Sequence, residues 1–151
     1  MSNNDLDIQI DEFSLKVINE TNSDLMFLCN LVNYTKSIPV RAYLKTKKLD
    51  AQPYEIDVTP CYVAAQTGTA VYAKDVQKTF PLDVFFTDND VDAYVGIAVY
   101  QEHQVRPLGL LVVLYKDAID NAADILDILK NHEEEAAKFL EQTSVCYKVA
   151  K

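Results

Sequence analysis

The chain has 151 residues, a length typical of one domain, and 49% of them are hydrophobic, which is enough for one substantial core. Its formal net charge of -9, from 23 acidic and 14 basic residues, repels the phosphate backbone of nucleic acids. The sequence therefore predicts a single domain over residues 1–151 with no nucleic-acid partner.

The sequence shows neither a membrane span nor a secretory signal. It has no run of about 18 apolar residues, and residues 1–12 carry acidic side chains but no basic one, the reverse of a signal peptide. The three cysteines, Cys29, Cys61 and Cys146, are odd in number and widely spaced, which is typical of free thiols in a reducing compartment. We therefore expect a cytoplasmic protein with no membrane partner.

The first part of the chain predicts two helices. A short one is expected over residues 11–20. A longer amphipathic helix is expected over residues 24–36, because Ser23 is a good capping residue and Pro39 follows as a breaker. Apolar spacing supports the longer helix at Leu25, Leu28, Val32 and Thr35.

Strand patterns follow Pro39. Residues 39–44 are rich in β-branched and aromatic side chains, and residues 54–58 alternate between apolar and acidic side chains. A lysine-bearing turn joins these two segments, and residues 70–73 predict a brief third strand.

The segment between the second and third of these strands predicts a short helix over residues 60–66. Thr59 suits the capping position, Pro60 suits the first helical position, and Gly68 closes the helix. Residues 75–92 alternate between polar and aromatic side chains. We expect them to form a loop and a short helix folded inward, so that the phenylalanine side chains are shielded from water.

Two almost continuously apolar runs, residues 93–100 and 107–115, predict an antiparallel hairpin. Strands that are apolar on both faces must be covered on both sides. A long C-terminal helix supplies one cover through the stripe Ala122, Ile125, Leu126, Leu129, Ala136 and Leu140. Residues 59–92 are left to cover the other face, and irregular segments of this kind tend to enclose a cavity.

The expected fold is therefore α+β. It has a central antiparallel sheet of five or six strands, N- and C-terminal helices on one face, and short helices and loops forming a pocket on the other. We place the core at about residues 20–142 and expect residues 1–10 and 143–151 to be flexible or peripheral.

Four short motifs carry a resemblance to a known family. They are Thr59-Pro60-Cys61, the Phe80-Pro81-x-Asp83 loop, Tyr94-Val95-Gly96-Ile97 and Leu108-Gly109-Leu110-Leu111. Together with the element order, they resemble the GAF family of sensory domains, whose fold is PAS-like. The resemblance implies a regulatory, ligand-sensing domain in signal transduction, upstream of an output domain or partner such as a histidine kinase or cyclase.

The resemblance also implies a ligand pocket. The residues at the matching positions are Tyr54, Thr59, Cys61, Tyr72, Phe80, Phe85 and Tyr94. Stacking and tyrosine hydroxyls would hold a small molecule there, although simple core filling explains the same aromatic residues. Cys61 is followed by Tyr62, whereas bilin-binding relatives commonly have a histidine after the attachment cysteine. No cofactor is identified, and Cys61 also fits the role of a small buried apolar residue.

The sequence favours binding over catalysis. A stand-alone branch of the family reduces free methionine sulfoxide with paired thiols, but Cys29 is expected in an outer helix, away from Cys61. Asp88, Asp90 and Asp92 lack the glycine and glutamate of a calcium loop. His103 and His132 have no ligand-spaced partners, so we expect a hairpin tip and a helix surface for them, with no metal site.

The alternative to a sensor is a ligand-free dimerisation module. The C-terminal stripe continues beyond the length that one sheet can cover, at Leu129, His132, Ala136, Phe139 and Leu140. This stripe predicts a homodimer formed through the terminal helices.

Overall fold

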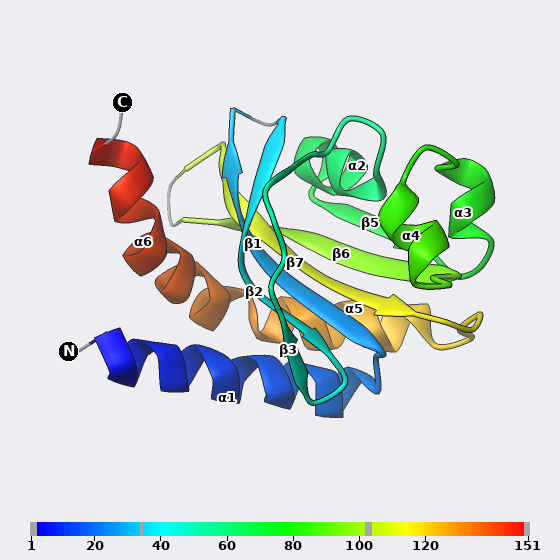
Figure 1. Ribbon diagram of the computed structural model, residues 1–151, viewed down its shortest axis with the longest axis horizontal. Coiled ribbons are helices and arrows are strands. Elements are labelled where there is room, and N and C mark those ends of the chain that lie inside the picture. The colour runs from blue at the N-terminus through cyan, green and yellow to red at the C-terminus, as the bar shows by residue number, and fades with distance from the viewer. Residues whose placement is uncertain (1–2, 34, 102–103, 150–151) are drawn as a thin grey trace.

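The computed structural model describes residues 3–33, 35–101 and 104–149 (Figure 1). One antiparallel sheet separates two layers of helices. The strands are β1 (Leu25–Val32), β2 (Lys36–Leu44), β3 (Lys47–Leu49), β4 (Tyr54–Glu55), β5 (Thr69–Tyr72), β6 (Ala93–Tyr100) and β7 (Pro107–Tyr115). The helices are α1 (Asn3–Thr21), α2 (Pro60–Thr67), α3 (Val76–Thr79), α4 (Val84–Asp88), α5 (Ala122–Asn131) and α6 (Glu133–Val149). The α+β fold expected from the sequence is confirmed.

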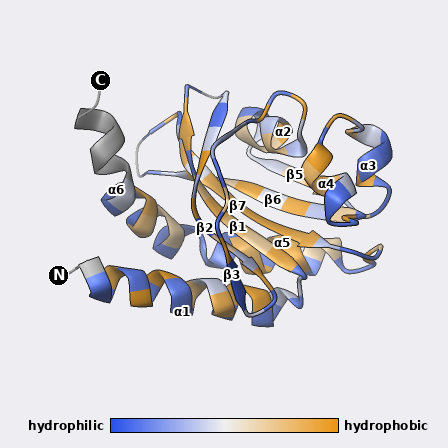
Figure 2. Ribbon diagram, viewed as in Figure 1, coloured by the Kyte–Doolittle hydropathy of each residue, from blue (hydrophilic) through white to orange (hydrophobic). Residues whose placement is uncertain are grey.

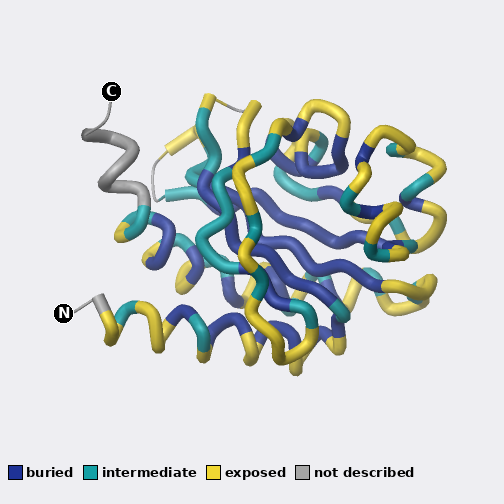
Figure 3. Tube along the Cα trace, viewed as in Figure 1, coloured by how far each residue is buried: buried dark blue, intermediate teal, exposed yellow. Residues whose placement is uncertain are grey.

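The seven-stranded sheet has the order β3-β2-β1-β7-β6-β5, and the short β4 also pairs with β2. The predicted hairpin is confirmed, because β6 and β7 pair in antiparallel register with Tyr94 opposite Leu114 and Ile97 opposite Leu111. The central pair of the sheet is β1 and β7, and β6 lies between β7 and the edge strand β5. The residues of β6 and β7 are almost all buried, so the middle of the sheet is dark in Figure 3 and apolar in Figure 2.

The predicted helix over residues 24–36 is wrong. Residues 25–32 form β1, which pairs with β2 on one side and β7 on the other. Because this strand is covered on both faces, apolar residues fill nearly every position, and their helical spacing is incidental. Ser23 caps no helix; its buried hydroxyl accepts a hydrogen bond from Thr21 at 3.0 Å.

One face of the sheet is covered by α1, α5 and α6. In Figure 1, α1 and α5 lie below the sheet and α6 lies to its left. Helix α1 is longer than the expected segment 11–20, and residues 3–10, expected to be flexible or peripheral, form its first turns. Ile10 is fully buried there. The apolar residues that α1 contributes to the core of this face are Ile10, Phe13, Val17 and Ile18.

The expected single C-terminal helix is two helices, broken at His132. His132 is only 7% exposed, so its expected place on a helix surface is wrong. Its Nε2 lies 2.9 Å from Glu20 Oε1, and its ring meets the edge of Phe13. His103, expected at the hairpin tip, lies outside the described residues.

The opposite face is covered by α2, α3, α4 and the segment between β3 and α2. The predicted start of α2 is confirmed, because the Thr59 hydroxyl accepts a hydrogen bond from the Cys61 amide at 3.2 Å and Pro60 occupies the first turn. Gly68 ends α2 with a φ of 97°, a conformation that favours glycine. The expected strand over residues 54–58 shortens to β4, after which the buried Ile56 donates its amide to the carbonyl of Thr35.

Candidate functional site

A cavity of about 400 Å³ lies between the sheet and the segments that cover its second face. Its floor comes from three strands, with Phe27 on β1, Tyr94 on β6, and Val112 and Leu114 on β7. Residues two apart on a strand point to the same face, so Val112 and Leu114 both face the cavity. Phe85 of α4 closes over Phe27, with ring centroids 5.1 Å apart in an edge-to-face arrangement.

A thiol and two phenols form the polar end of this cavity. Tyr94 donates a hydrogen bond from its hydroxyl to Cys61 Sγ at 3.3 Å, and the Tyr54 hydroxyl lies 3.5 Å from the same sulfur. Burial raises the pKa of Cys61 and holds the pKa values of Tyr54 and Tyr94 well above their ordinary values. The three groups are therefore neutral hydrogen-bonding groups at physiological pH.

Tyr94 reaches Cys61 because Gly96 has no side chain. A Cβ built on Gly96 would lie 2.6 Å from the Tyr94 hydroxyl and 2.8 Å from its ring carbon Cε1. The tyrosine ring therefore lies over Gly96 along β6. This close approach gives a physical reason for the Tyr-x-Gly spacing in the sequence.

The second cysteine lies on the same side of the sheet. Cys29 is in β1 and fully buried, so its expected place in an outer helix is wrong. It belongs to the same apolar cluster as Cys61. Burial raises the pKa of Cys29 to about 12, and the nearby Cys61 adds to the rise. The sequence argument that separated these two thiols in space fails, but their raised pKa values independently oppose thiolate chemistry.

Asp83 is a cavity residue that the sequence-based site set missed. It caps α4, where its Oδ1 accepts a hydrogen bond from the Phe86 amide at 3.4 Å, and its side chain faces the cavity. The residue is 9% exposed, and burial raises the pKa of its carboxyl group to about 6. The sequence signal that could have identified Asp83 is its position as a single carboxylate between the apolar residues Leu82 and Val84, within the Phe-Pro-x-Asp motif.

The structure brings five of the seven expected site residues together around the cavity. They are Tyr54, Thr59, Cys61, Phe85 and Tyr94. Tyr72 and Phe80 are not among the lining residues; their rings pack edge to face at 5.2 Å, and Tyr72 lies 6.3 Å from Tyr94. Tyr72 and Phe80 therefore pack behind Tyr94 and support the cavity wall without lining it.

The mouth of the cavity is apolar and open to solvent. Leu82 is 70% exposed and Val84 is 71% exposed, although both are large apolar side chains. Val58, at 38% exposure, stands on the other covering segment. Exposed apolar side chains around a concave site are typical of a ligand-binding rim.

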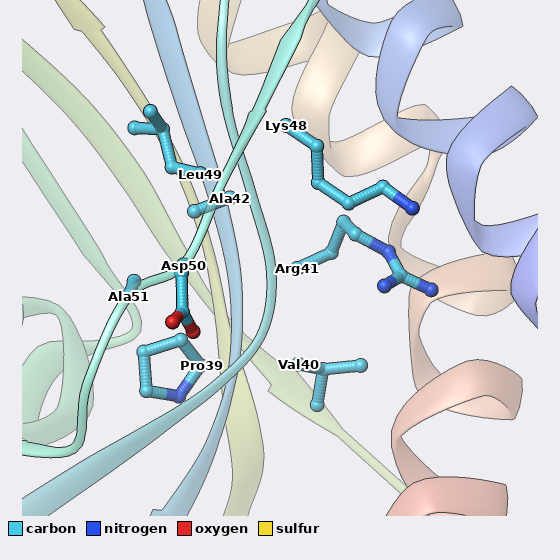
Figure 4. Close-up of a pocket in the computed structure, with 8 residues that line it drawn as sticks. All are labelled: Pro39, Val40, Arg41, Ala42, Lys48, Leu49, Asp50 and Ala51. Carbon is cyan, nitrogen blue, oxygen red and sulfur yellow. The ribbon is translucent and has the colours of Figure 1, made fainter.

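A second hollow of about 310 Å³ lies between β2 and β3, and Figure 4 shows the residues around it. Its two basic side chains, Arg41 and Lys48, point toward α1 and away from Asp50. Arg41 pairs with Asp7 at 2.8 Å and with Asp11 at 3.1 Å, and Lys48 pairs with Asp11 at 3.0 Å. These cations fasten α1 to the sheet.

No cluster of three or more metal-ligating side chains occurs among residues 4–33, 35–101 and 104–143, whose side chains the structure describes. In the same part of the chain, none of the helices combines the length and the hydrophobicity that a bilayer span requires.

No protein-family model and no curated protein matches this sequence. Solved structures do resemble it. The GAF domain of a two-component sensor histidine kinase from Bacillus halodurans is similar with a TM-score of 0.71 at 21% identity, covering 96% of this chain and 97% of that one. A red/green cyanobacteriochrome in its red light-absorbing state has a TM-score of 0.66 at 16% identity, covering 93% of this chain and 96% of that chain.

A third similar structure is the phycocyanobilin-bound GAF domain of a cyanobacterial phytochrome. Its TM-score is 0.63 at 13% identity, and the match covers 93% of this chain and 86% of that one. These matches span the sheet and both helical layers of the chain, in agreement with the motifs around Thr59, Asp83 and Gly96. The chain therefore has the fold of a GAF domain over nearly its whole length.

Proposed function

We propose that this chain is a regulatory, ligand-sensing domain in signal transduction, and that a small molecule binds in the cavity between the sheet and the segments around α2 and α4. The observation that carries the proposal is the cavity itself, which has about 400 Å³ of space, an apolar lining and a few convergent polar groups. A sensor histidine kinase domain and a bilin-bound domain among the similar structures support the same role.

Binding without chemical turnover fits the groups that surround the cavity. Burial raises the pKa values of Cys61 and Cys29, which keeps both thiols in the poorly nucleophilic neutral form. The described histidine, His132, lies on the other face of the sheet. In this proposal the output comes from a partner or a further domain, such as a kinase or cyclase.

A thermal-shift screen of metabolites tests the proposal. A ligand at 100 times its dissociation constant should stabilise the fold by about 2.7 kcal/mol. The Val58→Trp variant places a large ring at the cavity mouth and should abolish the shift. Val71→Trp is the matched control, because Val71 has nearly the same exposure, 40% against 38%, but lies on β5 away from the cavity. A ligand whose shift survives Val58→Trp unchanged would place binding elsewhere.

The second candidate function is a homodimer through the terminal helices. The apolar stripe that predicted this homodimer from the sequence packs inside the core of the monomer, since Leu129, Ala136 and Leu140 are fully buried. A different observation now favours it, because Ile8 and Leu15 lie exposed two turns apart on α1. Sedimentation of the wild type against Ile8→Asp with Leu15→Asp tests this candidate, and a monomeric wild type at high concentration would refute it.

A further inference from the structure

The charged side chains that line the cavity are all acidic. Its lining includes Asp50, Glu55 and Asp83, and no lysine or arginine is among the lining residues that the structure describes. Asp50 and Glu55 are exposed, whereas Asp83 is almost completely buried. The cavity therefore presents a negative potential from its mouth to its interior, which repels an anionic ligand and attracts a cation.

Two hydroxyl donors of the lining are already used within the wall. The Thr59 hydroxyl donates to the carbonyl of Ile56 at 2.8 Å, and the Tyr94 hydroxyl donates to Cys61. Gln52, which is exposed, uses one of its two amide hydrogens on Asp50. A molecule that enters the cavity therefore meets hydrogen-bond acceptors with spare capacity, chiefly the carboxylate of Asp83.

Asp83 has no cationic partner among the described residues. Its hydrogen bond to the Phe86 amide is long, at 3.4 Å. Desolvating a carboxylate without a counter-charge is unfavourable, and a cation that enters beside it restores the lost interaction. Arg41 and Lys48, the basic side chains of the neighbouring hollow, cannot neutralise Asp83, because they form ion pairs with α1 on the other face of the sheet.

The rest of the cavity favours a flat apolar body. Phe27 and Phe85 meet edge to face, and Phe86 and Tyr94 lie with ring centroids 6.3 Å apart. Aromatic walls of this kind take planar rings, and their faces also attract ammonium groups.

We propose that the ligand of this cavity is a planar apolar molecule that carries an amine, whose ammonium group pairs with the carboxylate of Asp83. The same cavity rejects the carboxylate analogue of the same ring. This inference rests on the proposed function, because it names the class of ligand for the site proposed above.

The competing explanation is that Asp83 only caps α4. Asparagine caps helices about as well as aspartate and has nearly the same shape, so Asp83→Asn keeps the cap and removes the charge. Asp88→Asn is the matched control, because it removes one carboxylate from the same helix at an exposed position outside the cavity lining.

Three indoles of graded charge serve as probes: tryptamine, 3-ethylindole and indole-3-acetate. The chain has no tryptophan, so indole fluorescence reports the ligand alone. A charge-assisted hydrogen bond contributes enough to expect tryptamine to bind at least roughly tenfold more tightly than indole-3-acetate. Asp83→Asn should weaken the binding of tryptamine about tenfold and leave the binding of 3-ethylindole unchanged. Asp88→Asn should change the affinity for neither probe.

The outcomes separate this inference from the proposed function. If the three indoles bind equally, or Asp83→Asn leaves tryptamine binding unchanged, the ligand class is wrong while small-molecule binding stands. If indole-3-acetate binds most tightly, the charge argument is also overturned. If none of the three binds to the wild type, the ligand class is wrong, and the thermal-shift screen alone decides the proposed function.

Discussion

The ring of Tyr94 lies over Gly96 on β6, and this contact holds the tyrosine hydroxyl against the thiol of Cys61. A methyl group on Gly96 would overlap the Tyr94 hydroxyl and two of its ring carbons, all within 2.9 Å. Tyr94 is fully buried and also packs against Tyr72 and Phe86, so its ring has little room to move. The side of the cavity that Tyr94 forms therefore depends on the absence of a side chain at Gly96, two residues further along β6.

Gly96→Ala is expected to destabilise the fold and to break the contact between Tyr94 and Cys61. Overpacking a well-packed core typically costs about 1–3 kcal/mol. Urea denaturation of the variant measures the cost. Gly96→Ala combined with Tyr94→Leu should recover part of the loss, since the shorter side chain frees the space. Equal stability of Gly96→Ala and the wild type would contradict the close packing of these two residues.

The hairpin of β6 and β7 and the helix α2 could be predicted because their signals are local. Two apolar runs with a polar spacer predict adjacent strands, and Thr59-Pro60 with Gly68 marks both ends of α2 by capping chemistry. The Phe-Pro-x-Asp motif likewise precedes a capped turn of helix. Patterns of this kind do not depend on the rest of the fold.

β1 could not be predicted, because its identity depends on its neighbours. Its sequence, LMFLCNLV, is rich in leucine and methionine, which favour helices, and only the pairing with β2 and β7 makes it a strand. That error also moved Cys29 from the sheet to an outer helix. Asp83 was missed as a cavity residue for a similar reason, since its burial depends on how α4 folds back over Phe27.

The carboxyl group of Asp83 should make stability depend on pH. Its pKa rises from 3.8 to about 6 on folding because of burial, so the folded state binds the proton more tightly than the unfolded state. This contribution to the unfolding free energy is fully present below the unfolded pKa and is lost as pH rises through about 6. The loss should amount to up to about 2 kcal/mol, after allowance for solvent screening.

Denaturation of the wild type and Asp83→Asn between pH 4 and pH 8 measures this dependence. Asparagine does not titrate, so the wild type should lose stability relative to the variant as pH rises to about 6, and the difference should then stay constant. A wild-type advantage that grows with pH in this range would show that the carboxylate is stabilised in the fold, against the expected sign.

The two described cysteines should react slowly with thiol reagents. In a Cys146→Ser background, Cys29 and Cys61 can be followed separately in variants that keep only one of them. With its pKa at about 12, Cys29 should react at pH 8 roughly a thousandfold more slowly than in the unfolded chain. Cys61 should react faster than Cys29, because it lines the cavity and Cys29 does not.

Labelling in denaturant is the control, since both thiols should then react at the same rate. Faster labelling of Cys29 than of Cys61 in the native protein would contradict the route of access through the cavity. Protection of Cys61 by tryptamine, with Cys29 unaffected, would connect this measurement to the ligand site.

His132 joins the break between α5 and α6 to α1 through Glu20. The two side chains meet at 2.9 Å, and the imidazole also fills space beside Phe13. His132→Ala is expected to cost about 2 kcal/mol, because it removes a buried ring and a hydrogen bond. Glu20→Ala should cost less, since Glu20 is partly exposed and loses only the bond.

A double-mutant cycle over His132→Ala and Glu20→Ala isolates the bond from the packing. A coupling energy of about 1 kcal/mol is expected for a partly buried hydrogen bond between side chains in contact. Lys130→Ala, two residues before His132 on the exposed side of α5, is the control and should be additive with Glu20→Ala. If the His132 and Glu20 losses are also additive, the imidazole holds the helix break by packing against Phe13 alone.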